Sequence, residues 1–174
     1  ISLFLLSISF TLILLDIDFF KRINDKYGHA GGDKVLMEVS QRLQKVCRTS
    51  DNLIRWGGEE FLFLVRNVDS SDLEEMSERI LKEIAKEPVV YDGKEIFVTT
   101  TIGFIQLPFA KISEQEMDWE KVLQVADMAL YTGKAHGRNR ACGVTELHVE
   151  YEQARVVLES DLSAALDNKW ISMV

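Results

Sequence analysis

The sequence predicts an α/β (α+β) domain in which helices flank a central, mostly antiparallel sheet. Apolar segments with the length and composition of buried strands occur at residues 9–17, 53–56, 61–65 and 96–105. Apolar residues recur at helical spacing at residues 34–48, 71–84 and 119–130. Short glycine-containing turns join several of the strands, which favours hairpins and antiparallel pairing over a doubly wound parallel sheet.

Length, charge and cysteine content narrow the classes of function. The chain of 174 residues has room for one compact domain plus an appendage, and 47% apolar residues allow a sizeable core. The net charge of −8 argues against binding to nucleic-acid polymers, which needs a basic face. Nucleotides remain possible, because a bound metal ion supplies positive charge locally. Cys47 and Cys142 are too few for a disulfide framework and indicate a cytoplasmic domain with reduced thiols.

The first fifteen residues are strongly apolar, and a buried strand over residues 9–17 explains their second half. A truncated membrane span or signal sequence is the alternative, but the run is short for a span and has no basic flank. Residues 1–8 receive no assignment, and the parent protein could still be anchored in a membrane. The polar stretch that follows predicts a loop over residues 21–33, marked by Gly28, Gly31 and Gly32.

The second half of the chain continues the alternation of helices and strands. Ser71 to Glu74 form a capping box that opens a helix, whose buried face consists of Leu73, Met76, Ile80 and Ile84. A turn at residues 92–93 leads into the strand at 96–105, and the helix that begins near Trp119 runs out at Gly133. Residues 146–168 are typical of one long amphipathic helix, which needs a partner surface.

Acidic residues lie at the ends of two predicted strands. Asp16 and Asp18 close the first strand, and Glu59 and Glu60 leave the turn made by the preceding glycine pair. If the strands are neighbours, these carboxylates meet at one edge of the sheet and repel one another unless a cation bridges them. Hard oxygen ligands favour Mg²⁺, which takes one or two carboxylates and completes its shell with substrate phosphate. A solvated acidic turn is the alternative.

Two cations follow at the end of the last predicted helix of this region. Lys134 and Arg138 lie four residues apart, so a helix would present them together. Acids that hold a metal, together with a paired lysine and arginine, are the parts that phosphoryl transfer requires. Taken alone, the two cations are also explained by the favourable electrostatics of a helix C-terminus.

The sequence LDIDFFKRIND at residues 15–25, with YGH at 27–29, RWGGEEF at 55–61 and a closing motif within residues 126–140, resembles the GGDEF family of diguanylate cyclases in its GGEEF form. The resemblance covers about residues 10–143, in the expected order. It implies a nucleotide-cyclase or palm-like fold with a ferredoxin-like core. It also implies an enzyme that condenses two GTP molecules into cyclic di-GMP and releases pyrophosphate.

The resemblance implies a role for each matching residue. Asp16, Glu59 and the carbonyl of Ile17 would hold Mg²⁺ or Mn²⁺, with Glu60 as a further ligand and catalytic candidate. Glu59 would also take the proton of the attacking 3′-hydroxyl, and Lys21 would stabilise charge on the phosphates. The substrate-binding residues would be Asn24, His29, Asp33, Gly57, Gly58, Lys134 and Arg138.

The carboxylate of Asp33 bears on whether the nucleotide carries guanine or adenine. A carboxylate accepts hydrogen bonds from the two neighbouring N–H groups of guanine, and adenine has no such pair. An adenine would leave the carboxylate unpaired, at a cost of roughly 1–3 kcal/mol. Asp33 therefore favours GTP over ATP, although it could instead be the N-cap of the helix that follows.

The family's chemistry also implies partners. Each domain carries one GTP, so catalysis would need a homodimer. Arg48 and Asp51 match an R-x-x-D site for inhibition by the product, and Arg79 resembles the secondary arginine of that site. A surface salt bridge between Arg48 and Asp51 is the ordinary alternative.

The two ends of the chain are expected to differ from an isolated family domain. The Asp-x-Leu-Thr-x-Leu-x-Asn-Arg stretch that the family usually has before its first strand is absent, so the amino-terminal part of a domain at 1–143 would be truncated or divergent. Residues 144–174 look like a linker helix and the beginning of an EAL phosphodiesterase domain. A non-catalytic module that binds GTP or cyclic di-GMP and controls such a domain is the alternative function.

Overall fold

The computed structural model describes residues 10–66, 70–107 and 119–144. The strands are β1 (Phe10–Ile17), β2 (Asn52–Gly57), β3 (Glu60–Arg66), β4 (Val89–Tyr91), β5 (Lys94–Ile96), β6 (Thr100–Leu107) and β7 (Ala141–Val144). The helices are α1 (Phe20–Val46), α2 (Ser70–Ala85) and α3 (Trp119–Ala135). Of these, β2-β3-β1-β6-β7 form one sheet in that order, while β4 and β5 form a separate hairpin. Only the β6–β7 pair is parallel among the described strands, so the predicted mostly antiparallel sheet is confirmed.

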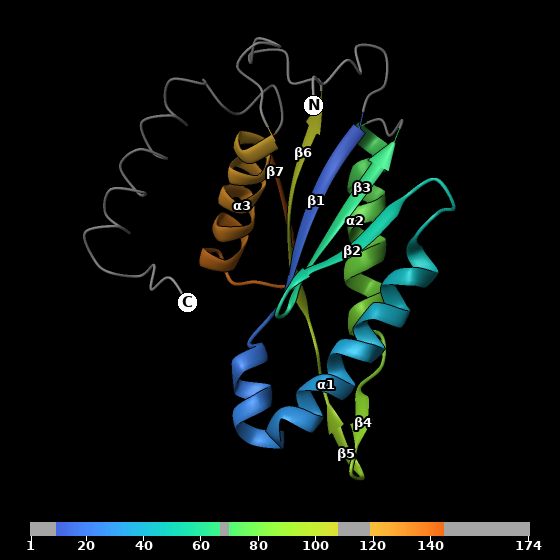
Figure 1. Ribbon diagram of the computed structural model, residues 1–174, viewed down its shortest axis with the longest axis vertical. Helices are drawn as coiled ribbons and strands as arrows, with labels where there is room; N and C mark the ends of the chain where they lie inside the picture. The colour runs from blue at the N-terminus through green and yellow to red at the C-terminus, as the bar shows by residue number, and fades with distance from the viewer. Residues whose placement is uncertain (1–9, 67–69, 108–118, 145–174) are drawn as a thin grey trace, which may run out of the picture.

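Strand β1 lies in the middle of this sheet and is covered on both faces, which explains its unbroken apolar sequence. Ile13 and Leu15 belong to the core shared with α1 and α2, whereas Leu12 and Leu14 belong to the core shared with α3. Figure 1 shows α3 on one side of the sheet and α1 with α2 on the other. Successive side chains of β1 point to opposite faces of the sheet, so the strand contributes residues to both hydrophobic layers.

The loop predicted over residues 21–33 is wrong, because this segment is part of α1. Only Gly28 leaves the helical conformation, with φ 75° and ψ 169°, and it produces a kink. Gly31 and Gly32 are buried in the helix, where a Cβ on Gly32 would overlap the Asn24 side chain. These two glycines allow close packing inside α1 and do not mark a loop.

Other expected boundaries also need correction. The strand predicted over 96–105 is divided into β5 and β6, which belong to different sheets. Strand β7 has no counterpart in the sequence-based prediction. Helix α2 begins one residue before the predicted capping box, and Leu73, Met76, Ile80 and Ile84 are buried as expected.

Helices α1 and α2 are joined by a buried arginine. The Nη1 of Arg42 donates to the carbonyl oxygens of Ile84 at 2.6 Å and Glu87 at 2.7 Å, so it satisfies carbonyls at the end of α2. Its Nε lies 3.5 Å from Oε1 of Glu38, also on α1. The interaction fixes α2 against α1 beneath the sheet.

The predictions for residues 1–8, for the helix at 146–168 and for the beginning of an EAL domain lie outside the described residues. Among the helices that the structure describes, none combines the length and the apolar character that a membrane crossing requires.

Candidate active site

The acids predicted to meet at one sheet edge do so. Strands β1 and β3 are antiparallel neighbours, and Asp16 is the register partner of Glu60. The backbone N–H of Ile17 donates to the carbonyl oxygen of Glu59 at 3.3 Å, which brings the turn between β2 and β3 against the end of β1. Asp16 is buried, with 8% exposure, so the alternative of a solvated acidic turn is excluded for this residue.

The carboxyl groups of Asp16 and Glu60 lie where little water reaches them. Burial raises the pKa of Asp16, and the charges of Glu59 and Asp18 raise it further, against the opposing hydrogen bond and charge of Lys134. Burial also raises the pKa of Glu60, and the charge of Asp16 adds to this effect. The arrangement therefore favours a bound cation, because a positive charge would offset both the burial of these carboxylates and their mutual repulsion.

One protein cation already lies at these acids. The Nζ of Lys134, on the last turn of α3, is 2.9 Å from Oδ2 of Asp16. This ion pair connects α3 to the end of β1 across the sheet. Lys134 therefore lies next to the acids. Favourable electrostatics at the C-terminus of a helix do not by themselves account for its position.

Arg138 is placed differently from the expectation. Helix α3 ends at Ala135, and Arg138 lies beyond it with φ 63°, so the two cations are not paired on a helical face. Its guanidinium instead lies over the ring of Phe19, with 4.5 Å from Cζ to the ring centroid. Because Phe19 follows Asp18 at the end of β1, Arg138 remains next to the acidic edge.

Asp18 is bound by protein groups. Its carboxylate accepts hydrogen bonds from the hydroxyls of Thr99 at 2.7 Å and Thr101 at 2.6 Å, and from the backbone N–H of Asn139 at 3.0 Å. These bonds tie the end of β1 to the start of β6 and to the loop after α3. The sequence analysis missed this function, because Thr99 and Thr101 lie far from Asp18 in the sequence.

The residues at this edge fit a magnesium ion. The available donors are carboxylate and carbonyl oxygens, which Mg²⁺ prefers. Within residues 10–66, 70–107 and 119–144, no group of three or more histidine, cysteine or acidic side chains is arranged so that it could hold a metal ion by itself. An ion that takes one or two carboxylates and completes its shell with substrate phosphate suits this open arrangement.

The glycine turn between β2 and β3 leaves open space around its backbone. Gly58 has φ 38°, and a Cβ added at Gly57 or Gly58 would meet no atom within 4 Å. The side chain of Arg55 donates from Nε and Nη2 to the carbonyl oxygen of Gly58, at 3.0 and 2.8 Å. The turn that carries Glu59 is thus held in place while space remains beside it.

Helix α1 carries the remaining predicted nucleotide contacts. The side chain of Asn24 lies against Gly32, the residue that precedes Asp33. Asp33 is inside α1, which makes the N-cap explanation wrong, and it lines a groove of about 650 Å³ with Arg55 of β2. Lys21 and His29 are exposed on the same helix.

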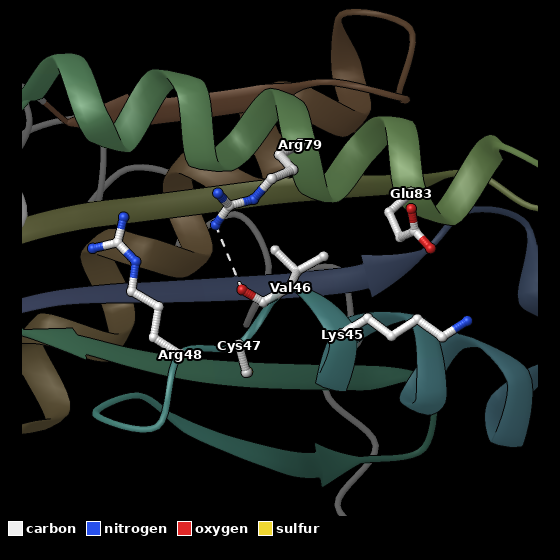
Figure 2. A pocket seen from close by; sticks show the side chains of 6 residues that line it. All are labelled: Lys45, Val46, Cys47, Arg48, Arg79 and Glu83. Atoms are coloured by element: carbon white, nitrogen blue, oxygen red, sulfur yellow. Dashed lines mark hydrogen bonds between the residues drawn. The ribbon is translucent and has the colours of Figure 1, made fainter.

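The residues of the predicted inhibitory site also lie together. Arg48 and Arg79 line a groove of about 510 Å³ with Lys45, Val46, Cys47 and Glu83. Figure 2 shows the two guanidinium groups at the same end of this groove, with Arg79 donating to the carbonyl oxygen of Val46 at 3.5 Å. Asp51 accepts the backbone N–H of Arg48 at 2.8 Å, and in the described structure no ion pair links their side chains, so the salt-bridge alternative is wrong.

The fold and the charged edge define a domain of the cyclase type, with acids and cations arranged around the end of a central antiparallel strand. The chain belongs to the family described as "Diguanylate cyclase, GGDEF domain", whose sequence model matches residues 6–140.

Individual relatives agree with this assignment. The chain is 41% identical over 133 residues to diguanylate cyclase A of Treponema denticola, a match that covers 75% of the chain and 34% of that relative. It superposes on the GGDEF domain of DgcB from Caulobacter crescentus, solved with c-di-GMP, with a TM-score of 0.70 and 29% identity over 78% of each chain. For diguanylate cyclase SiaD from Pseudomonas aeruginosa, solved with its activator SiaC, the TM-score is 0.71 and the identity 32%, over 78% of this chain and 50% of SiaD. The chain thus spans about a third of its full-length relative.

Proposed function

We propose that this chain is the catalytic domain of a diguanylate cyclase, which joins two GTP molecules into cyclic di-GMP and releases two molecules of pyrophosphate. The observation that carries the proposal is the register pairing of Asp16 with Glu60, with the ammonium of Lys134 on Asp16. This edge combines oxygen donors for a divalent cation with a positive group for phosphates. Family membership supports the same reaction.

Asp16, Glu59, Glu60 and the carbonyl of Ile17 are the proposed metal-binding groups. Mg²⁺ or Mn²⁺ bound there would neutralise charge on the triphosphate and lower the pKa of a nearby hydroxyl. Glu59 is the proposed base that accepts the proton of the 3′-hydroxyl. The Arg55 contact that holds the carbonyl of Gly58 supports this role, because a base must be fixed near the proton that it removes.

The cations of the site are the proposed phosphate ligands. Lys134 has three N–H donors, and since one is directed to Asp16, the others remain available to phosphate oxygens. Arg138 presents a planar set of donors suited to a phosphate. Lys21, exposed on the first turn of α1, would stabilise the charge that develops as the α-phosphate is attacked.

Guanine is proposed to lie against α1, where Asn24 lies against Gly32, the residue before Asp33, and His29 is exposed. Asp33 accepts from the guanine N–H pair that adenine lacks, so replacement of Asp33 by alanine should reduce the preference for GTP over ATP about five- to 150-fold. Gly57 and Gly58 leave the space that a phosphate needs beside the acids.

Product inhibition is proposed for the groove that contains Arg48 and Arg79. Two guanidinium groups at one end of a groove suit the phosphates and a guanine face of cyclic di-GMP. Asp51, which holds the turn at Arg48, would accept from a base edge. Because each domain binds one GTP, two copies of the domain must face each other during turnover.

The test is incubation of the purified protein with GTP and Mg²⁺, with cyclic di-GMP followed by chromatography. Wild-type protein should form the product, and Glu59→Gln should reduce its rate by at least about 100-fold, as expected for loss of a general base. The matched control is Glu75→Gln, an exposed acid on α2. Tight binding of GTP by wild-type protein without any product would support the regulatory module instead.

A further inference from the structure

Phe19 joins the end of β1 to the start of α1 in an unusual backbone conformation. Its φ of 57° and ψ of 28° place it in the left-handed region, although it is a bulky residue, and its side chain is 47% exposed. Left-handed conformations cost a non-glycine residue roughly 1–2 kcal/mol, and such residues gather at functional sites. The fold therefore keeps Phe19 in a strained position beside the acidic edge.

The ring of Phe19 is the meeting point of two arginines. The Cζ of Arg138 lies 4.5 Å from the ring centroid, and that of Arg22 lies 4.6 Å from it. Arg138 and the following Asn139 also have positive φ, at 63° and 46°. A second strained segment thus faces the first, and the contact between them is a cation–π interaction.

The backbone on the arginine side is fixed independently of this contact. The N–H of Arg138 donates to the carbonyl oxygen of Gly133 at 3.1 Å, and the N–H of Asn139 donates to the buried carboxylate of Asp18 at 3.0 Å. Asp18 immediately precedes Phe19, so one short segment of chain holds the loop backbone and supplies the ring. The only variable left for Arg138 is the direction of its long side chain.

We propose that Phe19 is a positioning residue for Arg138, which holds the guanidinium ready for the terminal phosphates of GTP. Stacking uses the face of a guanidinium and leaves the N–H groups in its plane for an anion. Among the described residues, the only hydrogen bond of this guanidinium is a long one of 3.5 Å from Nη1 to the carbonyl oxygen of Lys134. By restricting the rotamers of a flexible side chain before the nucleotide arrives, the ring reduces the entropy lost on binding.

This inference rests on the proposed role of Arg138 at the triphosphate, and its test separates the two. The probe is 3′-deoxy-GTP with Mg²⁺, which lacks the attacking hydroxyl, so calorimetry measures binding without turnover. Phe19→Leu should weaken binding about two- to fivefold, the range for an exposed cation–π contact. Phe19→Trp should bind at least as tightly as wild type, since tryptophan is the best ring for this interaction. The control Phe97→Leu makes the same change at a ring that is 75% exposed, and it should leave the affinity unchanged.

A double-mutant cycle identifies the residue through which Phe19 acts. In an Arg138→Gln background, Phe19→Leu should produce no further loss of affinity. A loss that persists in that background, or equal affinities of wild type and Phe19→Leu, would overturn the positioning role. Phe19→Met provides the same comparison if Phe19→Leu does not fold. If wild-type protein fails to bind 3′-deoxy-GTP, the proposed function itself fails, which is a different outcome from either of these.

Discussion

Removal of the Lys134 ammonium tests whether the acidic edge is electrostatically strained. Nζ of Lys134 and Oδ2 of Asp16 are 2.9 Å apart, and the side chains are 30% and 11% exposed. At an effective dielectric constant of about 20, the attraction alone is about 5–6 kcal/mol. Breaking a fully buried pair costs about 3–5 kcal/mol, and partial exposure of the lysine reduces this through screening. For Lys134→Ala we expect a loss of about 2 kcal/mol in unfolding free energy, or about 4–8 °C in Tm.

The assay is thermal unfolding followed by circular dichroism, without nucleotide or divalent cation. The matched control is Lys82→Ala, which removes an ion pair of 2.8 Å to Glu78 between side chains that are 78% and 68% exposed. That control should leave Tm unchanged within error, since exposed pairs contribute little. Adding Asp16→Asn to Lys134→Ala should restore much of the lost stability, because the buried carboxylate that loses its lysine partner is then neutral. Equal Tm values for Lys134→Ala and Lys82→Ala would refute the reasoning.

Three further predictions follow from particular contacts. Gly32→Ala should displace the Asn24 side chain, so we expect weaker binding of 3′-deoxy-GTP in calorimetry. Unchanged affinity would contradict the proposed position of guanine against α1. Arg42→Met leaves the carbonyls of Ile84, at the end of α2, and Glu87, just after it, without their charged donor, and a loss of about 3 kcal/mol is expected in urea unfolding. Burial and then the charge of Asp51 raise the pKa of Cys47 to about 11, so its alkylation at pH 8 should be about 100-fold slower than with a pKa of 9.0. That rate, followed by peptide mass mapping, should rise about tenfold per pH unit up to pH 10, and Asp51→Asn should increase it at pH 8.

The meeting of the two acidic segments could be predicted without the structure, although they lie far apart in sequence. The acids at the end of the first strand and after the glycine turn were expected to meet, and Asp16 and Glu60 are register partners. The prediction succeeded because the glycine pair predicts the β2–β3 hairpin and so places the glutamates at a strand end, and because an apolar strand such as β1 belongs in the middle of a sheet.

The failures concern side-chain contacts that the spacing of residues along the chain does not reveal. Three glycines within residues 20–33 indicated a loop, yet two of them are required by close packing inside α1. The role of Asp18 depends on Thr99, Thr101 and the loop after α3, which no spacing along the chain brings together. The place of Arg138 over the Phe19 ring was missed for the same reason.

The stoichiometry of the reaction tests the central proposal most directly. Purified protein is incubated with GTP and Mg²⁺, and pyrophosphate and cyclic di-GMP are both quantified in the same samples. The account predicts two pyrophosphates for each cyclic di-GMP, with both products lost together in Glu59→Gln. Pyrophosphate or phosphate released without the cyclic dinucleotide, or GTP bound without either product, would contradict it.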